Sequence, residues 1–219
     1  MLEKKIRRGR PKVKSDAERS TEIARCASSL FILHGYADVT MDDIAAACHI
    51  SKRTLYALFR SKADIFGRAI DDHRRSMLDL PGDYDDMPIA EALGRIFRID
   101  LSAAEDHERL AVVRMVRLEG ARFPELETML RERGGEHSRK LLAEWLERQK
   151  RAGRIDIGNT WFAAKTLMDM IFGAIIAKGA HGEVRWPSDE ERRAYLKQCI
   201  AIFTVGTLPA DSPERSRST

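Results

Sequence analysis

Residues 29–66 read SLFILHGYADVTMDDIAAACHISKRTLYALFRSKADIF and hold the clearest structural signal in this chain of 219 residues. Thr40 with Asp43 forms one helix-start signal and Ser51 forms another, because a hydroxyl at such a position can accept from a backbone N–H in the first turn. The pattern predicts two short helices, roughly 41–48 and 52–59, separated by about three residues. Such a pair is typical of a helix-turn-helix, whose second helix enters the major groove of DNA.

The two predicted helices carry different side chains on their two faces. The apolar positions are expected to hold the pair against the preceding helix: Ile44, Ala45, Leu55 and Leu58. The remaining positions form a polar and basic rim that includes Lys52, Arg53, Thr54, Tyr56 and the nearby Lys62. Arg53 is suited to a bidentate contact with guanine, and the other four suit phosphate oxygens. An ordinary helical hairpin with a solvated rim is the alternative.

The same stretch resembles the DNA-binding domain of TetR-family regulators over about residues 18–66. The resemblance rests on these residues: Leu30-Phe31, Gly35-Tyr36, Thr40, Ile44-Ala45, Ser51, Thr54-Leu55-Tyr56, Phe59 and Ser61-Lys62. It implies that Thr40, Thr54, Tyr56 and Lys62 touch phosphates and that Lys52 and Arg53 lie where the base sequence is read.

Two residues depart from the family pattern. His49 stands where the family usually has glycine, at a turn position that favours a positive φ, and histidine adopts that conformation at some strain. Arg53 stands where small residues are common. We interpret Arg53 as a determinant of operator sequence that leaves the fold intact.

The N-terminus forms a separate basic feature. Residues 1–14 hold seven Lys or Arg and one Glu, so they carry a charge of +6 in a chain whose net charge is +4. The segment RRGRPK, residues 7–12, resembles the core of an AT-hook, which would place Arg8 and Arg10 in a narrow minor groove. A merely solubilising tail is the alternative.

Helical periodicity continues to the C-terminus and predicts an all-α fold of about nine helices. Beyond the pair above, the predicted helices are residues 15–35, 61–80, 89–101, 108–121, 124–151, 159–179 and 188–205, with Gly134-Gly135 as a place where the seventh helix could break. The expected domains are a disordered basic arm (1–14), a helix-turn-helix domain (15–62), a ligand-binding and dimerisation domain (63–206) and a disordered tail (207–219).

The stretch RMVRLEGARFPELETMLRERG, residues 114–134, further resembles the C-terminal domain of the AefR-like TetR subgroup. That resemblance implies a homodimer through the helices at 159–179 and 188–205, and a pocket for a small-molecule effector. The residues expected to line the pocket are Phe97, Met115, Leu118, Arg122, Trp145, Met168 and Phe172. Simple core packing within one subunit is the alternative for both features. A dimer would match a palindromic operator in double-stranded DNA.

The composition argues against other classes of protein. Cys26, Cys48 and Cys199 lie far apart, so neither a disulfide framework nor a zinc site is expected. Residues 161–177 are apolar but include Lys165 and Asp169, which suit an intrahelical ion pair better than a membrane span. No nucleophile, phosphate-loop or HExxH motif is visible, so we expect no catalysis, cofactor or metal.

The sequence therefore predicts a cytoplasmic, sequence-specific DNA-binding regulator. Its most favoured form is a ligand-responsive homodimeric repressor of the TetR type. An activator of the same family and a less sequence-specific architectural DNA-binding protein remain alternatives.

Overall fold

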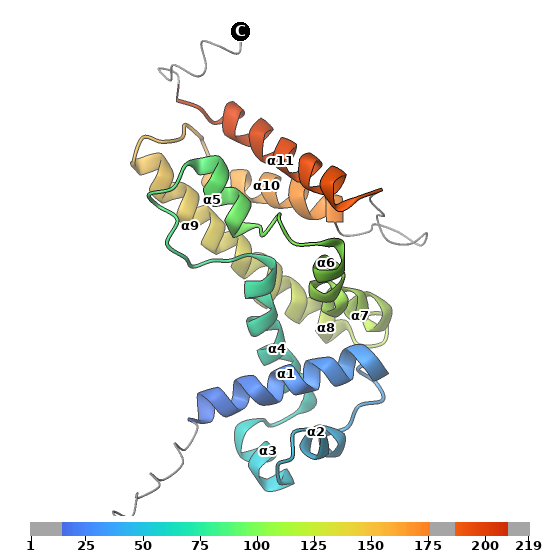
Figure 1. Ribbon diagram of the computed structural model, residues 1–219. Helices are drawn as coiled ribbons and strands as arrows, with labels where there is room; N and C mark the ends of the chain where they lie inside the picture. Colours follow the sequence, from blue (N-terminus) through green and yellow to red (C-terminus); the bar gives the residue numbers. More distant parts are fainter. Residues whose placement is uncertain (1–14, 176–186, 210–219) are drawn as a thin grey trace, which may run out of the picture.

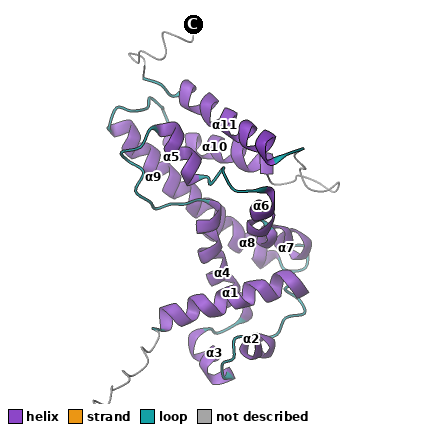
Figure 2. Ribbon diagram, in the orientation of Figure 1, coloured by secondary structure: helices purple, strands orange, loops and turns teal. Residues whose placement is uncertain are grey.

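The computed structural model describes residues 15–175 and 187–209, and these ranges are helical, with no strand among them (Figure 1, Figure 2). The elements are α1 (Asp16–His34), α2 (Met41–Ala47), α3 (Lys52–Leu58), α4 (Lys62–Met77), α5 (Ile89–Ile96), α6 (Ala103–Arg109), α7 (Ala111–Glu119), α8 (Pro124–Met129), the π-helix η1 (Leu130–Glu136), α9 (His137–Arg151), α10 (Thr160–Ile175) and α11 (Asp189–Gly206). The predicted all-α fold is confirmed. The predicted arm at 1–14, residues 176–179 of the eighth predicted helix and residues 210–219 of the predicted tail lie outside the described residues.

Side-chain caps set the starts of the helices. At α1, Glu18 N donates to Ser15 Oγ at 3.2 Å and the Glu18 carboxylate accepts from Ser15 N at 2.8 Å, which forms a capping box. Thr40 and Asp43 form the same box at α2. The hydroxyls of Ser51, Ser61 and Ser188 cap α3, α4 and α11. The predicted helix starts are therefore confirmed where a cap marks them.

The segment after α5 departs from the prediction. A single helix was expected over residues 108–121, but the chain forms α6 and then α7, with Leu110 between them. Ser102 and Glu105 form a capping box that starts α6. The sequence did not predict this shorter and more polar helix, because the apolar periodicity of residues 111–118 favoured a single longer helix.

The seventh predicted helix continues through its two glycines. α8, η1 and α9 follow one another directly, and residues 130–136 adopt the wider π-helical turn at Gly134 and Gly135. Counted as one helix, this run leaves ten helices in the described ranges, and α6 is the one beyond the nine predicted. The glycines therefore change the kind of helix instead of ending it.

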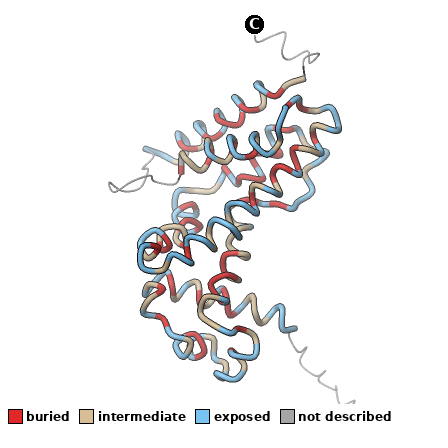
Figure 3. The backbone as a smooth tube through the Cα atoms, turned by 180° about the vertical axis from the view of Figure 1, so that it is seen from behind, coloured by how far each residue is buried: buried red, intermediate tan, exposed pale blue. Residues whose placement is uncertain are grey.

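The buried residues, which are red in Figure 3, include two hydrophobic clusters. The N-terminal core consists of buried residues from α1–α4, α7 and α8, among them Phe31, Tyr36, Ile44, Leu55, Phe66, Val112, Met115, Val116 and Leu126. The C-terminal core consists of buried residues from α5, α9, α10 and α11 and the segments beside them, among them Phe97, Leu142, Trp145, Leu167, Ile171 and Leu196. The predicted domain division at residue 62 stays a prediction.

The arrangement of helices follows from these two cores. Figure 1 shows α2 and α3 at one end of the molecule and α10 and α11 at the other, with α4 running between the two ends. Within the described ranges, no helix combines the length and the apolar character that crossing a membrane requires. α4 is thus the helix through which the chain passes from the helix-turn-helix into the larger body.

Candidate nucleic-acid interface

α2 and α3 form a tight helical hairpin. His49 N donates to Ala46 O at 3.1 Å and Ile50 N donates to Ala45 O at 3.0 Å, so the chain reverses directly after α2. His49 has φ 53°, which confirms the expectation that this position uses the left-handed region. Histidine therefore supports the turn that glycine would form without strain.

The inner face of the hairpin packs as the sequence predicts. Ile44, Ala45 and Leu55 are buried in the N-terminal core, and Leu58 packs against it. These contacts fix the hairpin against α1 and α4. The opposite face of α3 is consequently presented to solvent.

The exposed face carries the residues predicted to touch DNA. Lys52, Arg53 and Tyr56 are exposed on α3, and Thr40 is exposed at the start of α2. Within the ranges that the structure describes, the Arg53 side chain makes no hydrogen bond or ion pair with the protein. Its guanidinium is therefore available to a base edge without giving up an internal contact.

Lys52 is engaged by a carboxylate on the neighbouring helix. Its Nζ lies 2.6 Å from Asp42 Oδ2, and both side chains are more than half exposed. The hydrogen bond and the charge of Asp42 raise the pKa of Lys52. A phosphate contact by Lys52 therefore requires its ammonium group to be shared with Asp42 or released from it. The two residues are ten positions apart, so no local pattern in the sequence predicts this ion pair.

The hydroxyls of Thr40 and Thr54 take part in helix caps. Thr40 Oγ1 donates to Asp43 Oδ2 at 2.6 Å, and these bonds hold the pKa of Asp43 below its usual range. Thr54 Oγ1 lies 2.8 Å from Ser51 Oγ. Phosphate binding by either hydroxyl would compete with these local bonds, and it stays a prediction.

Lys62, which was predicted to bind a phosphate, makes several contacts within the protein. Its Nζ donates to the carbonyl oxygens of Tyr36 at 2.5 Å, Val39 at 2.7 Å and Ala37 at 3.3 Å, and lies 4.3 Å from the centre of the Tyr36 ring. Burial lowers the pKa of Lys62, and the charges of Glu119 and Asp38 oppose that shift. All three ammonium hydrogens thus hold the loop between α1 and α2, while the predicted phosphate contact stays a prediction.

The same loop is tied to the body of the molecule. Ala37 N donates to Glu119 Oε2, on α7, at 3.3 Å. The ring of Tyr36 lies 5.2 Å from that of Phe123, in an edge-to-face arrangement, and burial raises the pKa of Tyr36 to about 12. The sequence did not single out Glu119 as a partner of this loop, because the two segments are 82 positions apart.

The residues predicted to line an effector pocket are only partly brought together. Phe97 and Trp145 are buried in the C-terminal core, and Met168 and Phe172 pack against it. Met115 belongs to the N-terminal core, Leu118 is 85% exposed and Arg122 is exposed beside the Phe123 ring. The seven residues therefore do not share one site, and their role in ligand binding stays a prediction.

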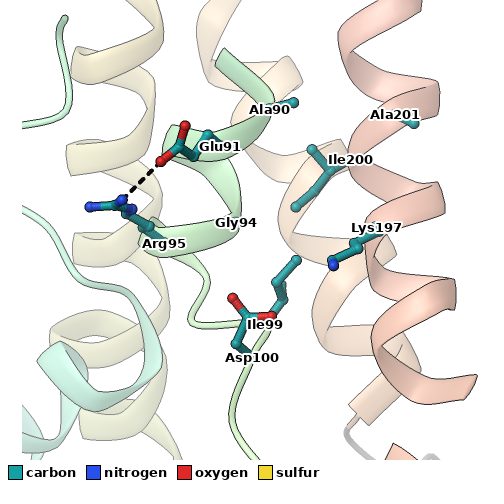
Figure 4. Close-up of a pocket in the computed structure, with 9 residues that line it drawn as sticks. All are labelled: Ala90, Glu91, Gly94, Arg95, Ile99, Asp100, Lys197, Ile200 and Ala201. Carbon is teal, nitrogen blue, oxygen red and sulfur yellow. Dashed lines mark hydrogen bonds and ion pairs between the residues drawn. The ribbon is translucent and has the colours of Figure 1, made fainter. Parts of the chain in front are cut away.

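Two cavities lie beside α5 instead. One, of about 470 Å³, runs between α5 and α11 (Figure 4) and is lined by Ala90, Glu91, Gly94, Arg95, Ile99, Asp100, Lys197, Ile200 and Ala201. The other, of about 510 Å³, is lined by Asp79, Tyr84, Gly94, Arg95, Arg98, Asp100, Leu101 and Glu105. None of the seven predicted residues lines either cavity. No local pattern in the sequence marked these lining residues, because the fold alone brings α5 and α11 together. The part of the chain that the structure describes holds no group of three side chains suited to a metal ion.

Comparison with known proteins gives two family matches. Residues 23–69 match the model of bacterial regulatory proteins of the tetR family. Residues 91–205 match the model of the AefR-like transcriptional repressor C-terminal domain. No curated protein matches.

Solved structures share the fold over nearly the whole chain. A TetR-family transcriptional regulator from Mesorhizobium loti is 20% identical, with 90% of this chain and 100% of that chain covered and a TM-score of 0.70. The flavonoid-responsive regulator FrrA is 26% identical, with 88% and 98% covered and a TM-score of 0.60. SmeT, the repressor of the Stenotrophomonas maltophilia multidrug efflux pump SmeDEF, is 16% identical, with 90% and 94% covered and a TM-score of 0.56.

Proposed function

This chain belongs to the TetR family of bacterial regulatory proteins, and on that premise we propose that it is a ligand-responsive homodimeric repressor that binds a palindromic operator. DNA binding and regulation of transcription are the function of the family. The observation that carries the proposal for this chain is the exposed face of α3, where Arg53 has no internal partner among the described residues. A regulator of this kind acts on the chromosome, so we place it in the cytoplasm.

Recognition of bases is assigned to the start of α3. Arg53 is the second residue of that helix, and residues near the N-terminus of a recognition helix commonly reach base edges. Phosphate contacts orient the helix without reading the base sequence, and we assign them to Lys52, Thr54, Tyr56, Thr40 and Lys62. Arg8 and Arg10 of the basic arm are assigned to the adjacent minor groove.

Dimerisation is assigned to α10 and α11. These two helices carry large apolar side chains that are exposed in the single chain: Trp161, Phe162, Tyr195, Ile202 and Val205. Exposed apolar groups on neighbouring helices favour burial against a second copy, and a C2 dimer presents the same patch twice. A dimer also sets two recognition helices about 34–36 Å apart, which is one turn of DNA.

Response to a small molecule is assigned to the body around α5 and α11. The cavities there lie at the far end of α4 from the helix-turn-helix (Figure 1), so a ligand that favours another position of α4 would alter the spacing of the recognition helices. Among similar proteins, FrrA is described as flavonoid-responsive and SmeT as a repressor. A tenfold loss of operator affinity needs a differential binding energy of only about 1.4 kcal/mol.

A binding selection on fragments of genomic DNA tests the proposal. The wild-type protein should select one palindromic sequence, and Arg53→Ala should still bind but with relaxed preference at one base pair of each half-site, at a cost of about 1–3 kcal/mol. Arg151→Ala is the matched control, because Arg151 is an exposed arginine on α9 and far from the hairpin in the sequence. Selection of fragments without a common sequence would favour the architectural alternative. Promoter activity measured with and without the protein separates a repressor from an activator.

A further inference from the structure

Three charged side chains are buried together where α6 and α11 meet. Asp106 and Arg109 lie on α6 and Arg192 lies on α11, and each side chain is 7% exposed or less. Asp189 Oδ1, at the start of α11, also accepts from Ala103 N at 2.8 Å, so the two helices are joined at this point. The pattern along α11 places Arg192 on the same stripe as Leu196, Cys199 and Phe203, and a charge on such a stripe calls for a partner.

The contacts within this cluster leave several N–H groups unused. Arg109 Nε lies 2.5 Å from Asp106 Oδ1, and Arg192 Nη1 donates to Asp106 Oδ2. Arg109 Nη1 also faces the carbonyl oxygens of Phe97 at 3.3 Å and Ser76 at 3.4 Å. Among the described residues, no acceptor meets Arg109 Nη2 or Arg192 Nε and Nη2, although all three nitrogens are buried. Buried guanidinium groups in folded proteins are normally satisfied by an acceptor, which points to a missing one.

The charges of the cluster do not balance. Two arginines are always protonated at neutral pH, and Asp106 supplies one negative charge against them. His73 on α4 faces Arg109, and burial together with the charge of Arg109 lowers its pKa to about 4, so it is neutral. Glu105 and Arg98 also interact with the arginines through their charges, and these two residues carry opposite charges that offset each other. One uncompensated positive charge in a buried site is costly, and an anion would remove that cost.

We propose that Arg109 and Arg192 bind the carboxylate group of a small organic acid, and that such an acid is the effector of this protein. A planar carboxylate matches the forked geometry of guanidinium donors, and its single charge equals the excess of the cluster. The inference that the acid acts as an effector rests on the proposed function, whereas the binding of a carboxylate at this site does not. The competing explanation is a purely structural Arg–Asp–Arg cluster.

Space for the rest of such a molecule is lined by two residues, Arg98 and Glu105, that interact with Arg109 and Arg192 through their charges. The cavity of about 510 Å³ is lined by Glu105, which precedes Asp106 on α6, and by Arg98, which follows Phe97 in the chain. Arg98 has φ 54°, a conformation that costs energy in an arginine and that accumulates at binding sites. The polar lining of this cavity, which includes Tyr84 and Arg95, suits an acid that carries other hydrogen-bonding groups.

The same arginine provides a route to the DNA-binding end. Arg109 Nη1 contacts the carbonyl oxygen of Ser76, in the last turn of α4, and α4 leads to the helix-turn-helix (Figure 1). A carboxylate that draws Arg109 toward itself would change this contact. Anion binding and the position of α4 are thereby linked through one side chain.

Thermal unfolding in matched acids and amides tests the site. Sodium acetate and sodium benzoate are compared with acetamide and benzamide, with ionic strength held constant by sodium fluoride. We expect at least one acid to raise the Tm of the full chain by about 2–4 °C over its amide. Equal Tm values for acids and amides would overturn the proposal.

Three variants assign the effect to the cluster. Arg192→Met should abolish the difference between acid and amide, and Arg193→Met, which removes the same charge from the next position of α11, should keep it. Asp106→Asn leaves both arginines without their carboxylate, so it should enlarge the difference and serves if Arg192→Met does not fold. A response of Arg192→Met equal to that of the wild type would show that the anions act elsewhere and would refute the site.

A separate measurement keeps this inference distinct from the proposed function. Operator affinity is measured for the wild type without any acid, and then with the acid that stabilises it most. Absence of operator binding would refute the regulator and leave the carboxylate site standing. Stabilisation by the acid without a fall in operator affinity would retain the site and refute its role as an effector site.

Discussion

Lys62 has a structural role that the sequence did not reveal. The TetR-like pattern assigns it to a phosphate, whereas its ammonium group donates to three carbonyl oxygens in the loop between α1 and α2. Those carbonyls follow the end of α1, where backbone acceptors lack helical partners. The lysine therefore holds the loop in place, and any contact with DNA is made from this position.

Replacing Lys62 by Met should destabilise the folded protein as well as weaken DNA binding. The change keeps the aliphatic stem and leaves three carbonyl oxygens without their donor, at a cost of about 1–3 kcal/mol in the free energy of unfolding. Urea unfolding measures the effect. Lys140→Met, at an exposed position of α9, is the control and should leave stability unchanged. Unchanged stability in the Lys62 variant together with weaker DNA binding would leave the phosphate contact as its only role.

His73 should make stability depend on pH. Its pKa is about 4 in the folded chain, below the ordinary value of 6.5, because partial burial and the charge of Arg109 both disfavour the charged imidazole. Ser76 Oγ lies 3.2 Å from its Nδ1. The unfolded chain therefore binds a proton first as pH falls. Stability is full above pH 6.5 and is lost between pH 6.5 and 4, by about 3 kcal/mol for this group. Urea unfolding at several pH values should give a flatter dependence for His73→Asn than for the wild type, and parallel curves would contradict the shift.

At the scale of single elements, the π-helix η1 sits where the body contacts α4. Arg133 of η1 lies 2.8 Å from Asp71 Oδ2, and its Nη1 would be 3.0 Å from a Cβ placed on Gly67. Gly67 thus leaves room for the guanidinium group against α4. A π-helical turn is uncommon and often marks a functional position, so its contact with α4 identifies a second place where the body influences that helix.

Two glycines that border open space should respond in opposite ways to alanine. Gly135 lies in η1 and Gly153, with φ 69°, follows α9, and neither has an atom within 4 Å of an added Cβ. Gly135→Ala should raise the free energy of unfolding by about 0.5–1 kcal/mol, because alanine favours helix. Gly153→Ala should lower it by about 1 kcal/mol or more, because alanine is strained at positive φ. Urea unfolding of both variants decides this, and destabilisation by Gly135→Ala would argue that residue 135 is not helical.

Local sequence patterns predicted the helices, but they did not predict contacts between residues far apart in the chain. The hydroxyls of Ser15, Thr40 and Ser188 predicted helix starts because a cap joins residues three positions apart. Ser102 and Glu105 carried the same signal for α6, which the neighbouring apolar run obscured. The pair of Arg192 with Asp106 spans 86 positions, and no local pattern specifies such a partner. The helix-turn-helix was therefore predictable to within one residue, since α2 and α3 each end one residue before the predicted bound, whereas the cavities beside α5 and the buried arginines were not.

At the scale of the whole molecule, the exposed apolar face of α10 and α11 should control oligomeric state. Ile202 is 56% exposed on α11 in the single chain. Ile202→Glu would place a charge in the proposed dimer interface, so it should yield a monomer and lower operator affinity by about tenfold or more. Sedimentation equilibrium and operator titration measure both effects.

Ile32 provides the matched control for that experiment. It is an exposed isoleucine of α1, at the other end of the molecule from α11 (Figure 1). Ile32→Glu should therefore remain dimeric. A dimer of undiminished affinity in the Ile202 variant would place the interface on another surface.

The N-terminal core has a consequence for how such a chain can be recombined. The packing around Phe31, Tyr36 and Leu55 includes four buried side chains from the middle of the sequence. These are Val112, Met115, Val116 and Leu126. A gene fusion that grafts only the first 70 residues onto another effector domain would leave this packing open and would solvate its apolar side chains. A functional chimera must carry the segment from α7 to α8 along with the DNA-reading helices, so the portable module of this regulator is discontinuous in the gene.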